Sequence, residues 1–171
     1  MPTPLGPVPD FYGHSIFCDD IRAEADGKFT FVGVYPTQLM VIHTAFPITL
    51  PKLCIGVVFN QRHSLFMPDL TLRVVMPGDD EDRPSIEAEL TGEVPAPERR
   101  TETDEYTMFG SNIVFSPFTI ERSGRIKVRI VRDGTAYRLG SLRVAHISEI
   151  SASTERSPQG EPASPSAPAS S

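Results

Sequence analysis

Long apolar runs are missing from this 171-residue sequence. No segment approaches the roughly 18 continuous apolar residues that a membrane-spanning helix requires. The opening MPTPLGPVPD has neither the basic start nor the apolar stretch of a secretory signal peptide. We therefore expect a cytoplasmic protein with no membrane span.

Cysteine is also scarce, because the chain contains only Cys18 and Cys54. Both lie in apolar stretches that are typical of strands, which favours two buried, reduced thiols. A disulfide between them is the alternative. The chain is long enough to bury a core without a disulfide or a metal ion.

Positive charge is in deficit, since 16 Lys and Arg face 22 Asp and Glu, for a formal net charge of −6. A generic nucleic-acid binder needs a cationic surface to displace counterions from phosphates, so we expect no nucleic-acid partner. A local basic patch remains compatible with this balance. Hydrophobic residues make up 39% and charged residues 22%, which is ordinary for one globular domain.

The two ends differ from the middle. Residues 1–10 carry four prolines, which remove backbone donors and predict an extended Pro-rich leader. Residues 151–171 contain no Val, Leu, Ile, Phe or Tyr, so nothing there offsets the entropy of ordering, and we predict a disordered Ser/Pro/Ala-rich tail. The folded domain is predicted over residues 11–150.

Between these ends the dominant sequence period is two. In the run 125–131 the even-numbered residues are Ile or Val, whereas Arg125, Lys127 and Arg129 occupy the odd positions. This alternation predicts a strand that is buried on one face. The runs 70–76 and 86–90 alternate in the same way and end at Pro or Gly, which indicates two more strands.

Other runs rich in Phe, Val, Ile and Tyr predict further strands at 12–18, 28–35, 39–43, 53–59, 112–120 and 135–147. We expect a break near Pro117, a bulge near Gly140 and a hairpin turn at Asp133-Gly134. No amphipathic helix competes with this pattern. The prediction is an all-β protein: a two-sheet antiparallel β-sandwich, Ig-like or C2-like, with about eight or nine strands.

The first third of the chain carries a distinctive set of short motifs. They are CDDIR at 18–22, GK at 27–28, GVY at 33–35 and LPKL at 50–53. This opening resembles an uncharacterised, bacterial and phage-associated domain family of unknown function. The resemblance implies a small β-sandwich with no established activity, and it supplies no catalytic residue.

The charged part of this opening predicts a corner between two strands. Asp26-Gly27 is a turn signal that would pair residues 16–22 with residues 29–35. The corner then contains Asp19, Asp20, Arg22, Glu24 and Lys28. Carboxylates in loops can bind Ca²⁺ or Mg²⁺, but the neighbouring cations favour a salt-bridged corner with no metal.

A second acidic run, 78–82, lies between two predicted strands. It suggests a calcium-dependent, membrane-docking sandwich, although the alternating ligand spacing of a calcium loop is missing. A solvated loop is the simpler interpretation.

Catalytic signatures are weak. Cys18 and His14 lie about 13 Å apart on one strand, too far for a thiol to be activated. A hydrolase-type enzyme would therefore need His43, His63 or His146 to approach Cys18 from another strand. No Gly-flanked Ser, Gly-rich phosphate loop or paired metal-ligand spacing is present, so we predict no catalytic residue and no cofactor.

The remaining candidate is the basic face formed by Arg125, Lys127 and Arg129. Further arginines that could extend it are Arg122, Arg132, Arg138 and Arg143. Basic side chains often only solvate the outer face of a strand. Our leading hypothesis is nevertheless a non-enzymatic binding or assembly module that uses this face and exposed strand edges to meet an unidentified protein partner.

Overall fold

The computed structural model describes residues 9–91 and 106–155, which form twelve strands, two single 3₁₀ turns and one short helix. A three-stranded antiparallel sheet has the order β1 (Phe11–Cys18), β6 (Leu53–Arg62), β9 (Tyr106–Phe115). A five-stranded sheet has the order β4 (Leu39–Ile42), β12 (Thr135–His146), β11 (Gly124–Arg132), β7 (Asp69–Val75), β8 (Ile86–Thr91).

Two small two-stranded antiparallel sheets complete the fold. They are β2 (Asp20–Ala23) with β3 (Phe29–Val32), and β5 (Ile48–Leu50) with β10 (Phe118–Ile120). The 3₁₀ turns are Ala25–Gly27 and His63–Leu65. Each sheet in the described part of the chain is open, so the molecule is all-β with several antiparallel sheets and no closed barrel there.

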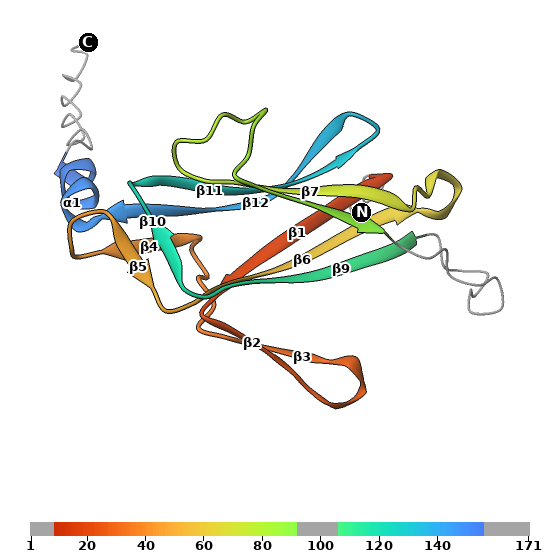
Figure 1. Cartoon of the computed structure of the whole chain (residues 1–171), viewed down its shortest axis with the longest axis horizontal. Helices are drawn as coiled ribbons and strands as arrows, with labels where there is room; N and C mark the ends of the chain where they lie inside the picture. The colour runs from red at the N-terminus through yellow and green to blue at the C-terminus, as the bar shows by residue number, and fades with distance from the viewer. Residues whose placement is uncertain (1–8, 92–105, 156–171) are drawn as a thin grey trace, which may run out of the picture.

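The two larger sheets form separate layers (Figure 1). One hydrophobic core lies between them. Side chains from alternate positions of both sheets fill this core. The inner face of the first layer contributes Phe17, Leu53, Ile55, Val57 and Phe59, and that of the second contributes Leu70, Leu72, Val74, Ile126, Val128, Ile130, Leu142 and Val144. Burial of this apolar surface is the main force holding the layers together.

Strand β11 confirms the alternation read from the sequence. Ile126, Val128 and Ile130 are fully buried, so the positions between them face outward from the layer. The predicted Asp133-Gly134 turn is also confirmed, because Arg132 pairs with Thr135 across it. The φ angles of 48° and 72° at the two turn residues are those of the tight turn that joins twisted strands.

The predicted irregularities near Gly140 and Pro117 are confirmed as well. Val128 pairs with Gly140 and Arg129 with Arg138, so Leu139 is an extra residue on β12 and forms a bulge. The predicted strand is interrupted at the Ser116–Pro117 bond, which separates β9 from β10.

Three expectations about strands were wrong. The count of eight or nine is too low, because the predicted runs at 16–22 and 112–120 each divide into two strands and β5 is too short to show a period. The sandwich was expected to be antiparallel throughout, but β4 pairs with β12 in parallel. Residues 16–18 pair with β6 rather than with residues 29–35, so the Asp26-Gly27 turn joins only β2 to β3.

A helix was not expected, yet α1 (Ile147–Glu155) follows β12 directly. It includes the first five residues of the predicted tail, so ordered backbone extends past residue 150. The rest of that tail, and residues 1–8 of the predicted leader, lie outside the described residues.

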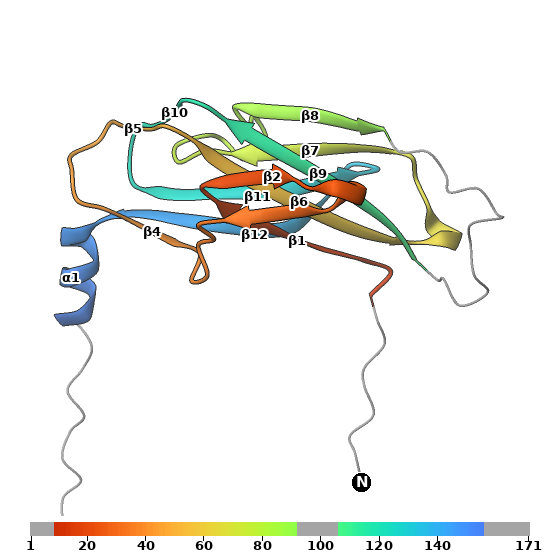
Figure 2. The same cartoon turned by 90° about the horizontal axis from the view of Figure 1, so that it is seen from below.

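The β2–β3 hairpin crosses the outer face of the three-stranded sheet, on the side opposite the five-stranded layer (Figures 1 and 2). The ring of Phe31 lies over Gly56 of β6 so closely that a Cβ atom there would meet it at 2.4 Å. The missing side chain at Gly56 therefore makes room for the hairpin.

Candidate functional site

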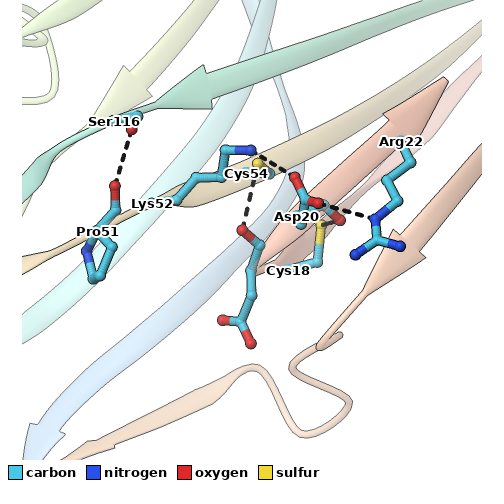
Figure 3. A network of polar contacts seen from close by, with 8 residues as sticks. Cys18, Asp20, Arg22, Pro51, Lys52, Cys54 and Ser116 are labelled. Carbon is cyan, nitrogen blue, oxygen red and sulfur yellow. Dashed lines mark hydrogen bonds and ion pairs between the residues drawn. The ribbon is translucent and has the colours of Figure 1, made fainter.

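Two charged regions are candidates for function, and the first is a corner where the motifs of the opening meet. Asp20 lies at the start of β2, and its carboxylate contacts Lys52 Nζ at 2.6 Å and Arg22 Nε at 3.2 Å (Figure 3). Lys52 comes from the LPKL segment just before β6. The two cations, Lys52 first, lower the pKa of Asp20. We call this region the motif corner.

Asp19 and Tyr35 join the GVY segment to the same corner. The Tyr35 hydroxyl donates to Asp19 Oδ1 at 2.8 Å. Burial, and then this hydrogen bond to a carboxylate, raise the pKa of Tyr35. Gly33 has a φ of 66°, and a Cβ atom there would lie 2.1 Å from Asp19 Oδ2, so the turn requires glycine.

The two cysteines lie beneath this corner. Cys18 of β1 is directly opposite Cys54 of β6, and both are fully buried thiols that form no disulfide. Their Sγ atoms donate to backbone carbonyls, Cys18 to Asp20 at 3.4 Å and Cys54 to Asp19 at 3.8 Å. Burial, with a contribution from the neighbouring Cys54, raises the pKa of Cys18 to about 11. A thiol with that pKa is mostly protonated at neutral pH.

Two residues assigned to the corner from sequence lie away from it. Glu24 and Lys28 face each other across the β2–β3 turn through a backbone hydrogen bond of 2.9 Å. Neither forms an ion pair among residues 9–91 and 106–155. The cation that pairs with Asp20 across the fold is Lys52. The charge pattern of the hairpin could not identify it, because Lys52 lies outside the hairpin.

The second region is a basic pocket on the outer face of β11 and β12, with a volume of about 420 Å³. Arg125, Lys127 and Arg129, the predicted basic face, all line it, and Arg138 of β12 adds a fourth cation. Ser141 lies beside them and accepts a hydrogen bond from Arg125 at 3.3 Å. The bulge at Leu139 accompanies the change of register that puts Arg138 opposite Arg129.

One carboxylate, that of Glu81, lies in this basic pocket. It comes from the acidic run 78–82 and contacts Lys127 Nζ at 2.5 Å and Arg129 at 2.9 Å. These two cations lower the pKa of Glu81 to about 2. Arg129 is largely buried, with 11% of its side chain exposed, so Glu81 supplies the charge partner that a buried cation needs.

The pocket therefore holds more positive than negative charge. Glu81 meets only Lys127 and Arg129, while Arg125 and Arg138 form no ion pair within the described ranges. Among the other predicted arginines, Arg132 binds Gln61 and the Leu65 carbonyl at a distance from this pocket. Arg122 lies beside Gly78 and lines a different cavity.

The acidic run itself is held by contacts within the protein. Asp79 accepts hydrogen bonds from the backbone of Met76 and from the backbone and hydroxyl of Ser85, at 2.7–2.8 Å. Within the described ranges no group of three or more His, Cys, Asp or Glu side chains could hold a metal ion. With Asp79 closing its own turn and Glu81 paired with cations, the run does not present a calcium cage.

None of the histidines is hydrogen-bonded to Cys18 in the part of the chain that the structure describes. His63 Nδ1 contacts the Thr107 hydroxyl at 2.6 Å, and His146 Nδ1 contacts the Ser148 hydroxyl at 2.8 Å. In the described residues the thiol of Cys18 has a hydrogen bond to a backbone carbonyl and none to a histidine. The geometry of a thiol nucleophile with an adjacent base is thus not formed there.

Fold and site together define an all-β protein with a paired corner and a basic pocket. A family model matches residues 14–145, so the chain belongs to the family of unknown function DUF6941. The chain matches no curated protein and no solved structure. None of the described helices has the length and apolar character needed to cross a membrane.

Proposed function

We propose that this protein is a non-enzymatic binding module, and that its basic pocket receives carboxylate side chains from an acidic segment of a protein partner. The pocket is open at the outer face of the five-stranded sheet and has three positive charges in excess of its single carboxylate. Such a surface attracts anions and raises their local concentration.

The contacts of Glu81 are the observation that carries this proposal. A carboxylate from a loop reaches into the pocket and meets two cations at once, which supports a carboxylate as the kind of group that the pocket accommodates. Arg125 and Arg138 lie at the same pocket, are exposed, and have no ion-pair partner in the described residues. A partner's carboxylates can bind these two arginines without displacing Glu81.

Supporting features come from the surrounding architecture. We infer that the two layers form an Ig-like or C2-like sandwich in a cytoplasmic bacterial protein, with β1 and β9 at the edges of one sheet and β4 and β8 at the edges of the other. Strand edges carry unpaired backbone groups that a partner can contact, and a protein partner is therefore favoured over a small anion.

The test is direct binding of a labelled ten-residue polyglutamate peptide to the full chain, measured by fluorescence anisotropy at low ionic strength. We expect the double variant Arg125→Gln/Arg138→Gln to weaken binding by about tenfold. Each lost charge contact should by itself weaken binding by roughly threefold or more. Added salt should weaken the wild-type interaction.

A matched control removes two positive charges elsewhere. Arg22→Gln/Lys28→Gln changes the net charge equally, but both residues belong to the β2–β3 hairpin on the other layer. Equal loss of affinity in the two double variants would show a nonspecific charge effect and contradict the proposal. So would binding of a phosphoserine peptide or single-stranded DNA in preference to polyglutamate.

A further inference from the structure

The two thiols beneath the motif corner are placed for a covalent bond. Cys18 ends β1, Cys54 is the second residue of β6, and the antiparallel register makes them direct partners. Direct partners in such a ladder have Cα atoms about 4.5 or 5.5 Å apart, and disulfides bridge separations of about 4.4–6.8 Å. Both side chains also project from the same face of the sheet. The pairing of β1 with β6 therefore brings the thiols within bridging range.

The segment that contacts these thiols carries charged side chains. Both thiols donate to carbonyls of the chain segment that turns from β1 into β2. That segment is joined to the residue just before β6 by the Asp20–Lys52 ion pair, whose side chains are 29% and 40% exposed. Exposed ion pairs contribute little to stability, so this fastening can open while the core stays folded.

We propose that Cys18 and Cys54 are a modification site, at which a low-molecular-weight disulfide such as oxidised glutathione converts the two thiols into a reversible cross-strand disulfide. The site is independent of the basic pocket, which lies on the other layer. It requires no metal and no group from outside the chain except the named oxidant.

The reaction balances as two thiol–disulfide exchanges. One protein thiol loses its proton, and its thiolate attacks a sulfur of the oxidised glutathione, forming a mixed disulfide and releasing one glutathione thiolate. The second protein thiolate attacks the protein sulfur of that mixed disulfide, forming the Cys18–Cys54 bond and releasing the second glutathione. The protein loses two protons and two electrons, and the oxidant is reduced to two thiols.

Burial of the two thiols also controls the rate of disulfide formation. A fully buried thiol that is mostly protonated exchanges slowly, so the corner must open for the first step. Weakening the Asp20–Lys52 fastening should therefore speed bond formation. After oxidation neither sulfur can donate to the Asp19 and Asp20 carbonyls, so the corner loses two weak hydrogen bonds while β1 and β6 become covalently joined.

The experiment incubates the native full chain in glutathione buffers of increasing oxidised fraction, quenches with acid, alkylates remaining thiols after unfolding, and measures intact mass. We expect a species with no alkyl group, no glutathione adduct and a mass two hydrogens below that of the reduced chain. Its Tm should be higher by about 5–15 °C, because a cross-link restricts the unfolded chain. Lys52→Met should form the species several-fold faster.

Three outcomes would overturn the proposal. Both thiols could still be free to react with the alkylating reagent after incubation at every buffer ratio. Alternatively, a stable adduct with a single glutathione could accumulate in place of the internal bond. The bond could also form only when the same buffers contain enough urea to unfold the chain. The variant Cys54→Ala serves as the control, since its single remaining thiol can give only an adduct.

Discussion

The motif corner and the basic pocket use the same residue types to opposite effect. At the corner Asp20 lies between Lys52 and Arg22, and Asp19 is held by the Tyr35 hydroxyl, so the central carboxylates all have partners. At the pocket four cations lie near a single carboxylate, which pairs with only two of them. Balanced charges fasten two parts of the chain together, whereas unbalanced charges leave a field that can attract a partner.

The difference also separates the N-terminal motif segments of this chain from the rest of the molecule. The CDDIR, GVY and LPKL segments all contribute to the corner, where the β2–β3 hairpin leaves β1 and returns toward β6. The charged residues of the pocket come from the β7–β8 loop, β11 and β12. We therefore expect substitutions in the corner to change folding stability and substitutions in the pocket to change binding.

The largest effect should follow from Gly33→Ala at the corner. The new Cβ atom would meet the Asp19 carboxylate, and the positive φ disfavours any residue but glycine, so we expect a loss of about 2–3 kcal/mol in the free energy of unfolding. Urea denaturation measures it. Gly110→Ala is the matched control, because its Cβ would find its nearest neighbour only at 3.9 Å. Equal free energies of unfolding for the two variants would contradict a structural role for the corner.

A charge reversal in the pocket should leave stability almost intact. Arg138 is exposed, so Arg138→Glu should change the free energy of unfolding by less than about 0.5 kcal/mol. It should nevertheless weaken polyglutamate binding by about tenfold, since a cation becomes a repelling anion. Anisotropy and urea titration on the same sample give both values. Arg22→Glu is the comparison at the corner, and a similar loss of affinity there would erase the distinction between the regions.

A smaller effect, of opposite sign, is expected from Glu81→Gln. This variant removes the carboxylate that now neutralises part of the pocket, so affinity for polyglutamate should rise about threefold. The measurement is the same anisotropy titration. Weaker binding by Glu81→Gln would mean that Glu81 shapes the pocket for its partner instead of competing with it.

The pH dependence of stability should give the smallest effect. Lys127 and Arg129 hold the pKa of Glu81 near 2 in the folded protein, below its ordinary value of 4.5. The stabilisation is therefore complete above about pH 4.5 and disappears as the pH falls toward 2. Tm measured from pH 6 to pH 3 should decline less steeply in Glu81→Gln than in the wild type. Parallel curves would exclude a stabilising ion pair.

Local features of this fold were predictable from sequence. A period of two is enough to assign inward positions such as Ile126 and Val128, because alternate side chains in a strand face opposite sides. The Asp133-Gly134 turn and the irregularity at Gly140 follow from backbone preferences of single residues. Each of these signals depends only on near neighbours in the chain.

What escaped prediction depends on distant partners. Strand β1 pairs with β6 across the intervening hairpin, so Lys52 rather than Lys28 meets Asp20, and Cys54 meets Cys18. Glu81 reaches the basic pocket from a loop more than forty positions earlier in the sequence. The alternation placed Arg125, Lys127 and Arg129 on one face of a strand, but the carboxylate that pairs with two of them lies in a run that was interpreted as a solvated loop.

The tip of the β2–β3 hairpin offers a practical handle. Gly27 has no heavy atom within 4 Å of where a Cβ would lie, and the hairpin is on the side of the molecule away from the five-stranded layer. A short peptide tag inserted between Asp26 and Gly27 would anchor the protein to a sensor chip by that tip. The arginine-lined hollow would then point into the flowing solution, where incoming chains could reach it unobstructed.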